Sequence, residues 1–192
     1  MTWTCNNAWP KKRRNKHESL YCRYRSGAWE SEPGEDVSIW YGSVLRGDAN
    51  FIEIGDRTNV QDGTIIHVDH DAPTKIAADV TVGHQCMLHG CTIETGALIG
   101  MSSIVLNHAV IGENSLLGAG SLVTQGQVIP PNVLAFGRPA KVIRPLTKAE
   151  IAKNQANIQH YLEMGKPTLP GIFRKFRNRM WQRWNMIYAK NS

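Results

Sequence analysis

The sequence predicts an all-β solenoid, a parallel β-helix of triangular cross-section built from six-residue repeats and followed by one α-helix. Aliphatic residues recur every six positions at Ile93, Ile99, Val105, Ile111, Leu117 and Val123. A small residue follows four positions after each of the first five, at Ala97, Ser103, Ala109, Ser115 and Ser121. A period of six fits neither a helix of 3.6 residues per turn nor simple strand alternation. We therefore expect three faces per coil, with the aliphatic residues inside and the small residues near the corners.

Residues 1–36 precede the repeat and carry no six-residue pattern. They contain a basic run and three tryptophans, namely Lys11, Lys12, Arg13, Arg14 and Lys16, and Trp3, Trp9 and Trp29. Basic residues interleaved with aromatic residues can bind nucleic acid, although charge runs of this kind are more often solvated tails. We favour a divergent basic and aromatic segment that stays outside the folded core.

The solenoid is predicted to span residues 37–145. Its earlier inward positions are Ile39, Leu45, Ile54, Val60, Ile66, Ile76, Val82 and Leu88, with a change of phase after Leu45. Residues 67–75 break the pattern with two aspartates and a proline, which predicts a loop bulging from a corner. The pattern fades after Val123, and we expect Pro130 and Pro131 to end the solenoid.

A helix is predicted for residues 146–165. Thr147 and Glu150 have the spacing of a capping box, and Gly165 suits the end of a helix. Ile151, Ile158 and Leu162 lie along one helical face. We expect this face to pack against the solenoid.

Residues 166–192 form a basic amphipathic tail. Apolar residues at helical spacing, Ile172, Phe173, Phe176, Met180, Trp184 and Ile187, lie among seven cations and no anions. Such a segment can lie on an anionic membrane surface, dock on another subunit or remain disordered. All three interpretations stay open, and contact with a membrane is the least favoured.

The net charge of +6 belongs to the ends of the chain. Residues 37–165 hold eight Lys or Arg and eleven Asp or Glu, so the body of the protein is mildly acidic. This argues against nucleic-acid binding by the solenoid. No run of eighteen apolar residues and no apolar signal region are present. Cys5, Cys22, Cys86 and Cys91 form no CxxC pair, which favours a reducing cytoplasm.

Two histidines are expected on one outward column. Ile66 and Leu88 occupy equivalent positions on adjacent coils, so His67 and His89, which follow them, should point outward about 4.8 Å apart. Arg46, directly after Leu45, falls on the same column one coil earlier if the change of phase near Phe51 adds no face. Two stacked imidazoles can converge on one metal ion. The remaining histidines, His17, His70, His108 and His160, are read as ordinary solvated side chains.

A third histidine lies around a corner. His84 follows Val82 by two residues, which places it one coil above Asp62 with Gln61 beside it. A ligand there is awkward within one chain, but natural in a threefold assembly where unlike faces of neighbouring subunits meet. Three imidazoles with an open fourth position make a catalytic zinc site. Cys86 and Cys91 are close in sequence and are more simply read as buried packing residues.

Short motifs in a fixed order identify a family resemblance. They are Arg46-Gly-Asp48, Asn59-Val-Gln61-Asp62-Gly63, His67, Gly83-His84 and His89-Gly90-Cys91. Together they resemble the gamma-class carbonic anhydrases, especially the bacterial carbonic anhydrase-like branch, from about Val37 to Met164. The resemblance implies a left-handed parallel β-helix of hexapeptide repeats and a homotrimer. It also implies zinc, or iron in its place, held by His67 and His89 of one subunit and His84 of its neighbour.

The resemblance also implies roles for other residues. Gln61 would lie beside the metal-bound solvent, Asn59 belongs to the same motif, and Arg46, Asp48 and Asp62 would order the subunit interface. The implied reaction is hydration of carbon dioxide to bicarbonate by metal-bound hydroxide.

Departures from the family pattern keep two other functions open. The loop after His67 has no glutamate, and Ala49 stands where the most active members carry one, so activity is expected to be weak or absent. One alternative is a hexapeptide-repeat acyltransferase using an acyl-CoA, because residues 136–144 resemble the solenoid exit of both groups. Another is a non-catalytic trimeric metal-binding scaffold. Three histidines favour the metal enzyme, since a transferase needs only one.

Overall fold

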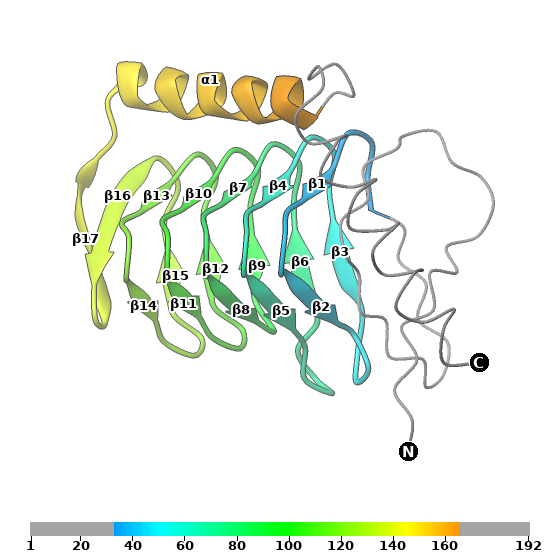
Figure 1. The fold of residues 1–192 in the computed structure, drawn as a ribbon. Helices are drawn as coiled ribbons and strands as arrows, with labels where there is room; N and C mark the ends of the chain where they lie inside the picture. Colours follow the sequence, from blue (N-terminus) through cyan, green and yellow to red (C-terminus); the bar gives the residue numbers. More distant parts are fainter. Residues whose placement is uncertain (1–32, 166–192) are drawn as a thin grey trace, which may run out of the picture.

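A computed structural model describes residues 33–165 (Figure 1). The predicted basic N-terminal run and the amphipathic tail of residues 166–192 lie outside the described residues. The described chain is a left-handed parallel β-helix followed by one α-helix, as predicted. Within residues 33–165, no helix is long and apolar enough to cross a membrane.

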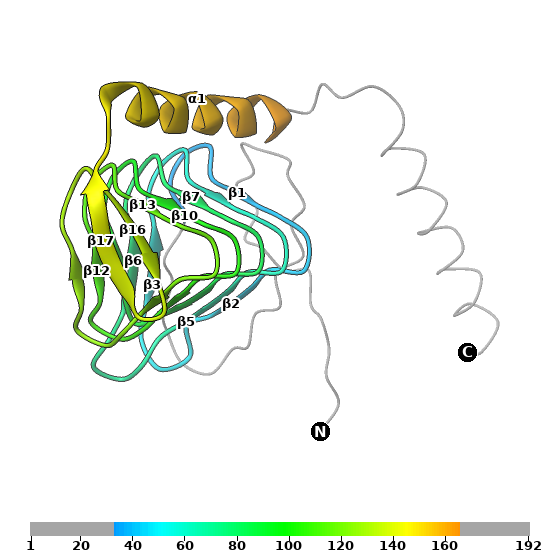
Figure 2. The same ribbon diagram turned by 90° about the vertical axis from the view of Figure 1, so that its left-hand side faces the viewer.

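Three sheets form the faces of the solenoid. Sheet A contains β1 (Ser38–Ile39), β4 (Asn59–Val60), β7 (Thr81–Val82), β10 (Leu98–Ile99), β13 (Leu116–Leu117), β16 (Val133–Gly137) and β17 (Ala140–Pro145). Sheet B contains β2 (Val44–Arg46), β5 (Ile65–His67), β8 (Met87–His89), β11 (Ile104–Val105) and β14 (Leu122–Val123). Sheet C contains β3 (Ile52–Ile54), β6 (Thr74–Ile76), β9 (Thr92–Ile93), β12 (Val110–Ile111) and β15 (Val128–Ile129). The coils lie over one another when viewed along the solenoid (Figure 2).

The aliphatic residues of the repeat fill the interior. In sheet B, Ile66 pairs with Leu88 and Leu88 with Val105, and all three are fully buried. Equivalent columns run through sheets A and C, so each aliphatic side chain packs on its equivalents one coil away. Burial of these columns is the main stabilising contribution to the fold.

Small residues at the corners satisfy two constraints. Thr58 is buried, and its hydroxyl donates to the carbonyl oxygen of Ala77 on the next coil at 2.8 Å. Space is equally limited directly after a strand, because a Cβ at Gly100, the residue that follows β10, would lie 2.5 Å from the backbone nitrogen of Ala119. A large residue at either position would therefore separate adjacent coils.

The expected end of the solenoid at Pro130 and Pro131 was wrong. Ile129 and Ala135 continue the inward column at six-residue spacing, and β16 pairs in parallel with β13 before β17 pairs back on it. The two prolines lie in the corner between β15 and β16, where the fixed φ of proline suits a turn. A proline is excluded from the middle of a ladder, but it is tolerated at a corner.

The helix α1 (Lys148–Gly165) lies along the outside of sheet A, above β4 and β1 (Figure 1). Ile158 is buried, and Tyr161 meets Trp40 edge to face with ring centroids 5.7 Å apart. The predicted capping box is confirmed. The Glu150 carboxylate accepts the backbone N–H of Thr147 at 2.9 Å, and the Thr147 hydroxyl accepts that of Glu150 at 3.3 Å.

This cap predicts an acid-sensitive contribution to stability. Hydrogen bonds from Arg144, and then from Thr147, lower the pKa of Glu150 from 4.5 to about 2. A carboxyl group whose pKa is depressed by folding stabilises the fold fully above its ordinary pKa, and this contribution disappears as the pH falls through the lowered value. In Glu150→Gln, the midpoint of urea unfolding should therefore depend less on pH between 4.5 and 2 than in the unaltered chain. Identical pH profiles would contradict this role.

Candidate metal centre

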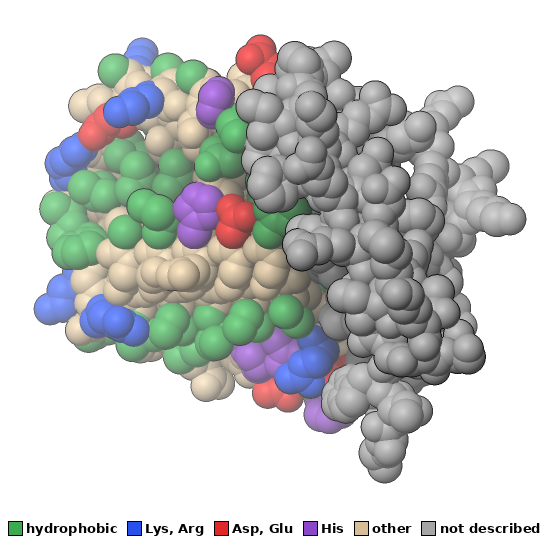
Figure 3. Space-filling model, in the orientation of Figure 1, with side chains coloured by type: hydrophobic (Ala, Val, Ile, Leu, Met, Phe, Trp, Pro, Cys, Tyr) green, Lys and Arg blue, Asp and Glu red, His purple; other side chains and the backbone are tan. Residues whose placement is uncertain are grey.

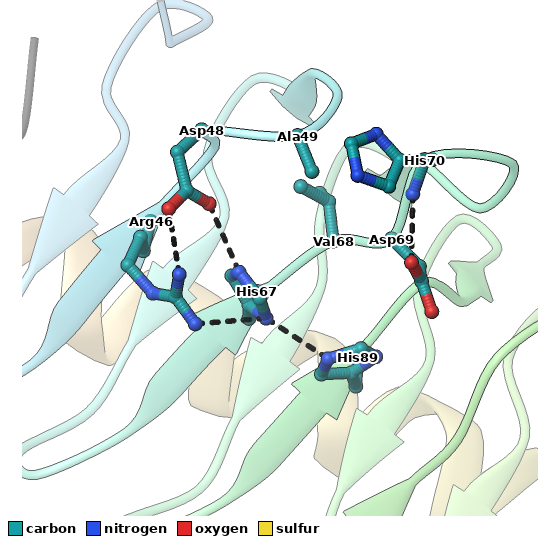
Figure 4. Close-up of a pocket in the computed structure, with 8 residues that line it drawn as sticks. All are labelled: Arg46, Asp48, Ala49, His67, Val68, Asp69, His70 and His89. Atoms are coloured by element: carbon teal, nitrogen blue, oxygen red, sulfur yellow. Dashed lines mark hydrogen bonds and ion pairs between the residues drawn. The ribbon is translucent and has the colours of Figure 1, made fainter. Parts of the chain in front are cut away.

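Two of the three predicted metal ligands lie together on the outer surface of sheet B. Arg46 pairs with His67, and His67 with His89, so the three form the predicted column and the phase change adds no face. His67 Nδ1 lies 2.9 Å from His89 Nε2, with ring centroids 4.8 Å apart (Figure 4). We call Arg46, Asp48, His67 and His89 the sheet B cluster.

The partners of the two rings determine which nitrogen lone pairs are available. Asp48 Oδ1 lies 3.0 Å from His67 Nε2, and the hydrogen bond from His67, followed by that from Arg46, lowers the pKa of the Asp48 carboxyl. On the other ring, Asn107 Oδ1 lies 2.5 Å from His89 Nδ1. Because each neutral imidazole carries one N–H, the lone pairs of His67 Nδ1 and His89 Nε2 face each other. Arg46 Nη2, which is a donor only, also lies 3.3 Å from His67 Nδ1, in keeping with a lone pair on that nitrogen. Two converging lone pairs fit a cation.

The first residues of the loop 68–73, namely Val68, Asp69 and His70, line the pocket above these rings (Figure 4). The Thr74 hydroxyl donates to the carbonyl oxygen of His67 at 2.6 Å and accepts the N–H of Gly90 at 2.9 Å. It therefore fixes the backbone directly after both histidines. Asn50 donates to the carbonyl oxygens of Asp69 and His70, at 3.2 and 2.9 Å. The predicted bulge at the corner is confirmed.

The remaining predicted site residues form a second group at the corner between sheets A and B. His84 Nδ1 lies 3.0 Å from Asp62 Oδ2, which leaves Nε2 as the lone-pair nitrogen of a neutral ring. Gln61 is 5% exposed and donates from Nε2 to Asn59 Oδ1 at 3.1 Å. Asn59 in turn donates to Thr81 Oγ1 at 2.9 Å. We call Asn59, Gln61, Asp62 and His84 the corner cluster.

The two clusters do not meet within one chain. Among residues 33–165, no three His, Cys, Asp or Glu side chains are arranged so that they could hold a metal ion together. In the space-filling view, a histidine lies beside an acidic side chain at mid-height on this face, and histidine, acidic and basic side chains lie together near its lower edge (Figure 3). His67 and His89 are therefore brought together, whereas His84 lies around the corner where the repeat had placed it.

An apolar ladder runs between the clusters on the outer face of sheet B. Val44, Ile65 and Met87 are in register on adjacent coils, each about two-fifths exposed, and the column continues through Ile104 and Leu122. Exposed Tyr41 and Met101 lie along the neighbouring corner. A contiguous apolar strip of this length is characteristic of a protein interface. We call the five residues of the column the sheet B ladder.

The two described cysteines are packing residues, as expected. Cys86 and Cys91 are each 1% exposed. Burial raises the pKa of the Cys86 thiol to about 11 and that of Cys91 to about 12. Both groups are therefore neutral at physiological pH, whereas a thiol must lose its proton to bind zinc.

Sequence reasoning had missed three residues that support the clusters: Thr74, Thr81 and Asn107. Thr81 contacts Asn59 from the adjacent coil, and Thr74 joins His67 on its own coil to Gly90 on the next. The six-residue register could have revealed the two contacts between coils. Asn107 follows β11, and no motif marks it as part of the site.

Comparison with known proteins defines the family. Residues 90–125 match the family described as bacterial transferase hexapeptide (six repeats). The chain is 49% identical over 133 residues to a carbonic anhydrase of Geobacillus kaustophilus, an alignment covering 69% of this chain and 73% of that protein. It is 41% identical over 139 residues to the mitochondrial gamma carbonic anhydrase 2 of Arabidopsis thaliana, covering 69% of this chain but only 50% of the plant protein.

A solved structure also matches the fold and much of the sequence. A hexapeptide transferase family protein from Anaplasma phagocytophilum superimposes with a TM-score of 0.67 at 45% identity, covering 71% of this chain and 80% of that one. Together with the Geobacillus relative, these similarities show that the chain belongs to the gamma-class carbonic anhydrase-like family of hexapeptide-repeat proteins.

Proposed function

We propose that this chain forms a homotrimer that binds zinc, or iron in its place, and hydrates carbon dioxide to bicarbonate. His67 and His89 of one subunit and His84 of a neighbour would hold the metal. The main support is the arrangement of the imidazoles, since two lone pairs converge in the sheet B cluster and the third histidine presents Nε2 from another face. We place this activity in the cytoplasm, consistent with the two cysteines of residues 33–165, which are buried free thiols.

The other residues of the clusters have separate tasks. Bound zinc would supply Lewis acidity that lowers the pKa of a coordinated water to about 7. Asp48 and Asp62 accept N–H groups of His67 and His84 and so orient the rings. Asn59 accepts the Gln61 amide N–H, which leaves Gln61 Oε1 to accept a hydrogen bond from reacting solvent. Arg46 donates to Asp48 at 2.6 Å and would order the subunit interface.

A hexapeptide acyltransferase using an acyl-CoA is the second candidate. It is supported by the transferase description of the matching repeat family and by the name of the Anaplasma protein. The carbonic anhydrase name of the Geobacillus relative and the three-histidine set favour the metal enzyme. Metal content and oligomeric mass of the purified protein, together with acyl-CoA binding, separate the two. An assay of carbon dioxide hydration separates the enzyme from a trimeric metal-binding scaffold.

Hydration of carbon dioxide is expected to be slow although metal is bound. Val68 and Ala49 line the pocket where proton-accepting side chains would be useful, and only Asp69, Asp71 and His70 in the loop can substitute. If proton transfer limits turnover, stopped-flow rates should rise when imidazole buffer is added at constant pH. A fast rate that does not depend on the buffer would contradict this expectation.

Gln61→Ala is expected to reduce hydration by about 10- to 100-fold while metal content and trimer mass remain unchanged. Gln61 contacts Asn59 and is not placed as a ligand. The exposed Gln125→Ala provides a control that should retain the original rate. Loss of metal from Gln61→Ala would show that the glutamine supports the ligands themselves.

A further inference from the structure

A line of three side chains connects the pocket loop to a predicted metal ligand. Asn107 Nδ2 donates to Asp69 Oδ2 at 3.1 Å, and Asn107 Oδ1 lies 2.5 Å from His89 Nδ1. A carboxylate can only accept hydrogen bonds, so the amide nitrogen of Asn107 must face Asp69. The amide oxygen of Asn107 is thereby turned toward His89. The hydrogen bond to Asp69 therefore determines which end of the amide faces the histidine.

This orientation determines the tautomer of His89. An amide oxygen is an acceptor only, so the single proton of the neutral ring must lie on Nδ1. The Nε2 lone pair then points toward His67 Nδ1, which is 2.9 Å away. Without Asn107, the proton is free to move to Nε2, where it blocks the nitrogen that a metal needs.

The same contact ties the loop to the site. Asp69 accepts the backbone N–H of His70 at 2.8 Å, and its backbone pairs in both directions with that of Ala72. Asn50 holds this loop from the preceding coil, and Asn107 holds it from two coils further on, beyond the coil that carries His89. Asn107 therefore holds both the loop and the His89 ring in place.

We propose that Asn107 is a positioning residue that fixes His89 in the Nδ1–H tautomer and presents Nε2 to the metal, with Asp69 acting through it. The metal-binding part rests on the proposed function, whereas the tautomer can be measured in metal-free protein. No motif of the family resemblance includes Asn107, which lies eighteen residues beyond His89 in the sequence.

The first test is nitrogen NMR of metal-free protein labelled with 15N-histidine at pH 8, with His89 assigned by its loss in His89→Gln. The unaltered chain should show a protonated Nδ1 and an unprotonated Nε2. Asn107→Ala should populate the Nε2–H form. The control Gln125→Ala changes the equivalent corner one coil on, where the N–H of Gly126 donates to the Asn107 carbonyl oxygen, and should leave His89 unchanged. An Nε2–H ring in the unaltered chain, or no change in Asn107→Ala, would overturn the proposal.

The second test exchanges the two partners. Asn107→Asp alone sets two carboxylates against each other and should disturb the loop, whereas Asn107→Asp combined with Asp69→Asn restores an acceptor for His89 and a donor between the two positions. The double variant should recover the Nδ1–H signal. A signal no closer to the original than that of Asn107→Asp would show that Asp69 does not act through Asn107.

Metal affinity provides the final readout. Zinc or cobalt should bind about 10- to 100-fold more weakly to Asn107→Ala than to the unaltered trimer, the usual effect of losing a partner of a ligand. The double variant should recover most of this loss. Unchanged affinity despite an altered tautomer would overturn the positioning role. If the unaltered trimer binds no metal, the proposed function fails, while the NMR result still decides the tautomer.

Discussion

His84→Ala and His89→Ala are each expected to lose nearly all bound metal, and the two proteins refolded together are expected to regain part of it. Each variant alone lacks one ligand at every site. In mixed trimers, some sites combine an intact His84 from one chain with intact His67 and His89 from another. For random assembly of equal amounts, about a quarter of the sites should be complete. Loss of a direct ligand should weaken binding by more than the roughly 10- to 100-fold cost of losing an outer partner.

The geometry of the two clusters is the reason for this expectation. His67 and His89 are 2.9 Å apart between facing nitrogens, whereas His84 is held at another corner by Asp62. Each variant refolded alone controls for the procedure, and mass spectrometry of differently labelled chains establishes that mixed trimers form. Metal recovery above either parent supports a shared site. Mixed trimers without recovery would place all three histidines of one site in a single chain.

The fold could be predicted from the sequence because its core repeats. Ile66 and Leu88 are separated by an irregular loop and a change of spacing, yet counting three faces between them gave the observed register. That register placed His67 beside His89 and separated His84 from both. A period that fixes the backbone also fixes which side chains share a column, so a surface cluster follows from a core pattern.

Features that do not follow the period were harder to predict. Pro130 and Pro131 are poor strand residues, but they occupy a corner where no ladder hydrogen bond is required. The contact between Asn107 and Asp69 joins a corner of the solenoid to an inserted loop whose path the six-residue pattern does not specify. The two prolines therefore led to a wrong prediction of where the solenoid ends. Side-chain contacts outside the repeat could be identified only in the three-dimensional structure.

Ile65→Glu is expected to convert the trimer into single chains while preserving the solenoid. Ile65 lies in the sheet B ladder between Val44 and Met87, and it is 41% exposed in one chain. A carboxylate there remains solvated in a monomer. In the proposed trimer, three such groups would be buried at the interface, and each unpaired buried charge costs several kcal/mol. Size-exclusion light scattering should therefore report a monomer, and far-ultraviolet circular dichroism should remain unchanged.

Metal binding should disappear together with the trimer. If the site requires His84 from a neighbour, dissociation leaves only the two facing imidazoles of the sheet B cluster. Because the metal would then bind only to the assembled trimer, loss of the trimer weakens metal binding. Val128→Glu is the matched control, because Val128 is 64% exposed on sheet C, away from the ladder and both clusters. It should retain trimer and metal. A trimer that survives Ile65→Glu with its metal would mean that the subunits meet through another face, whereas a monomer that retains full metal affinity would place the whole site within one chain.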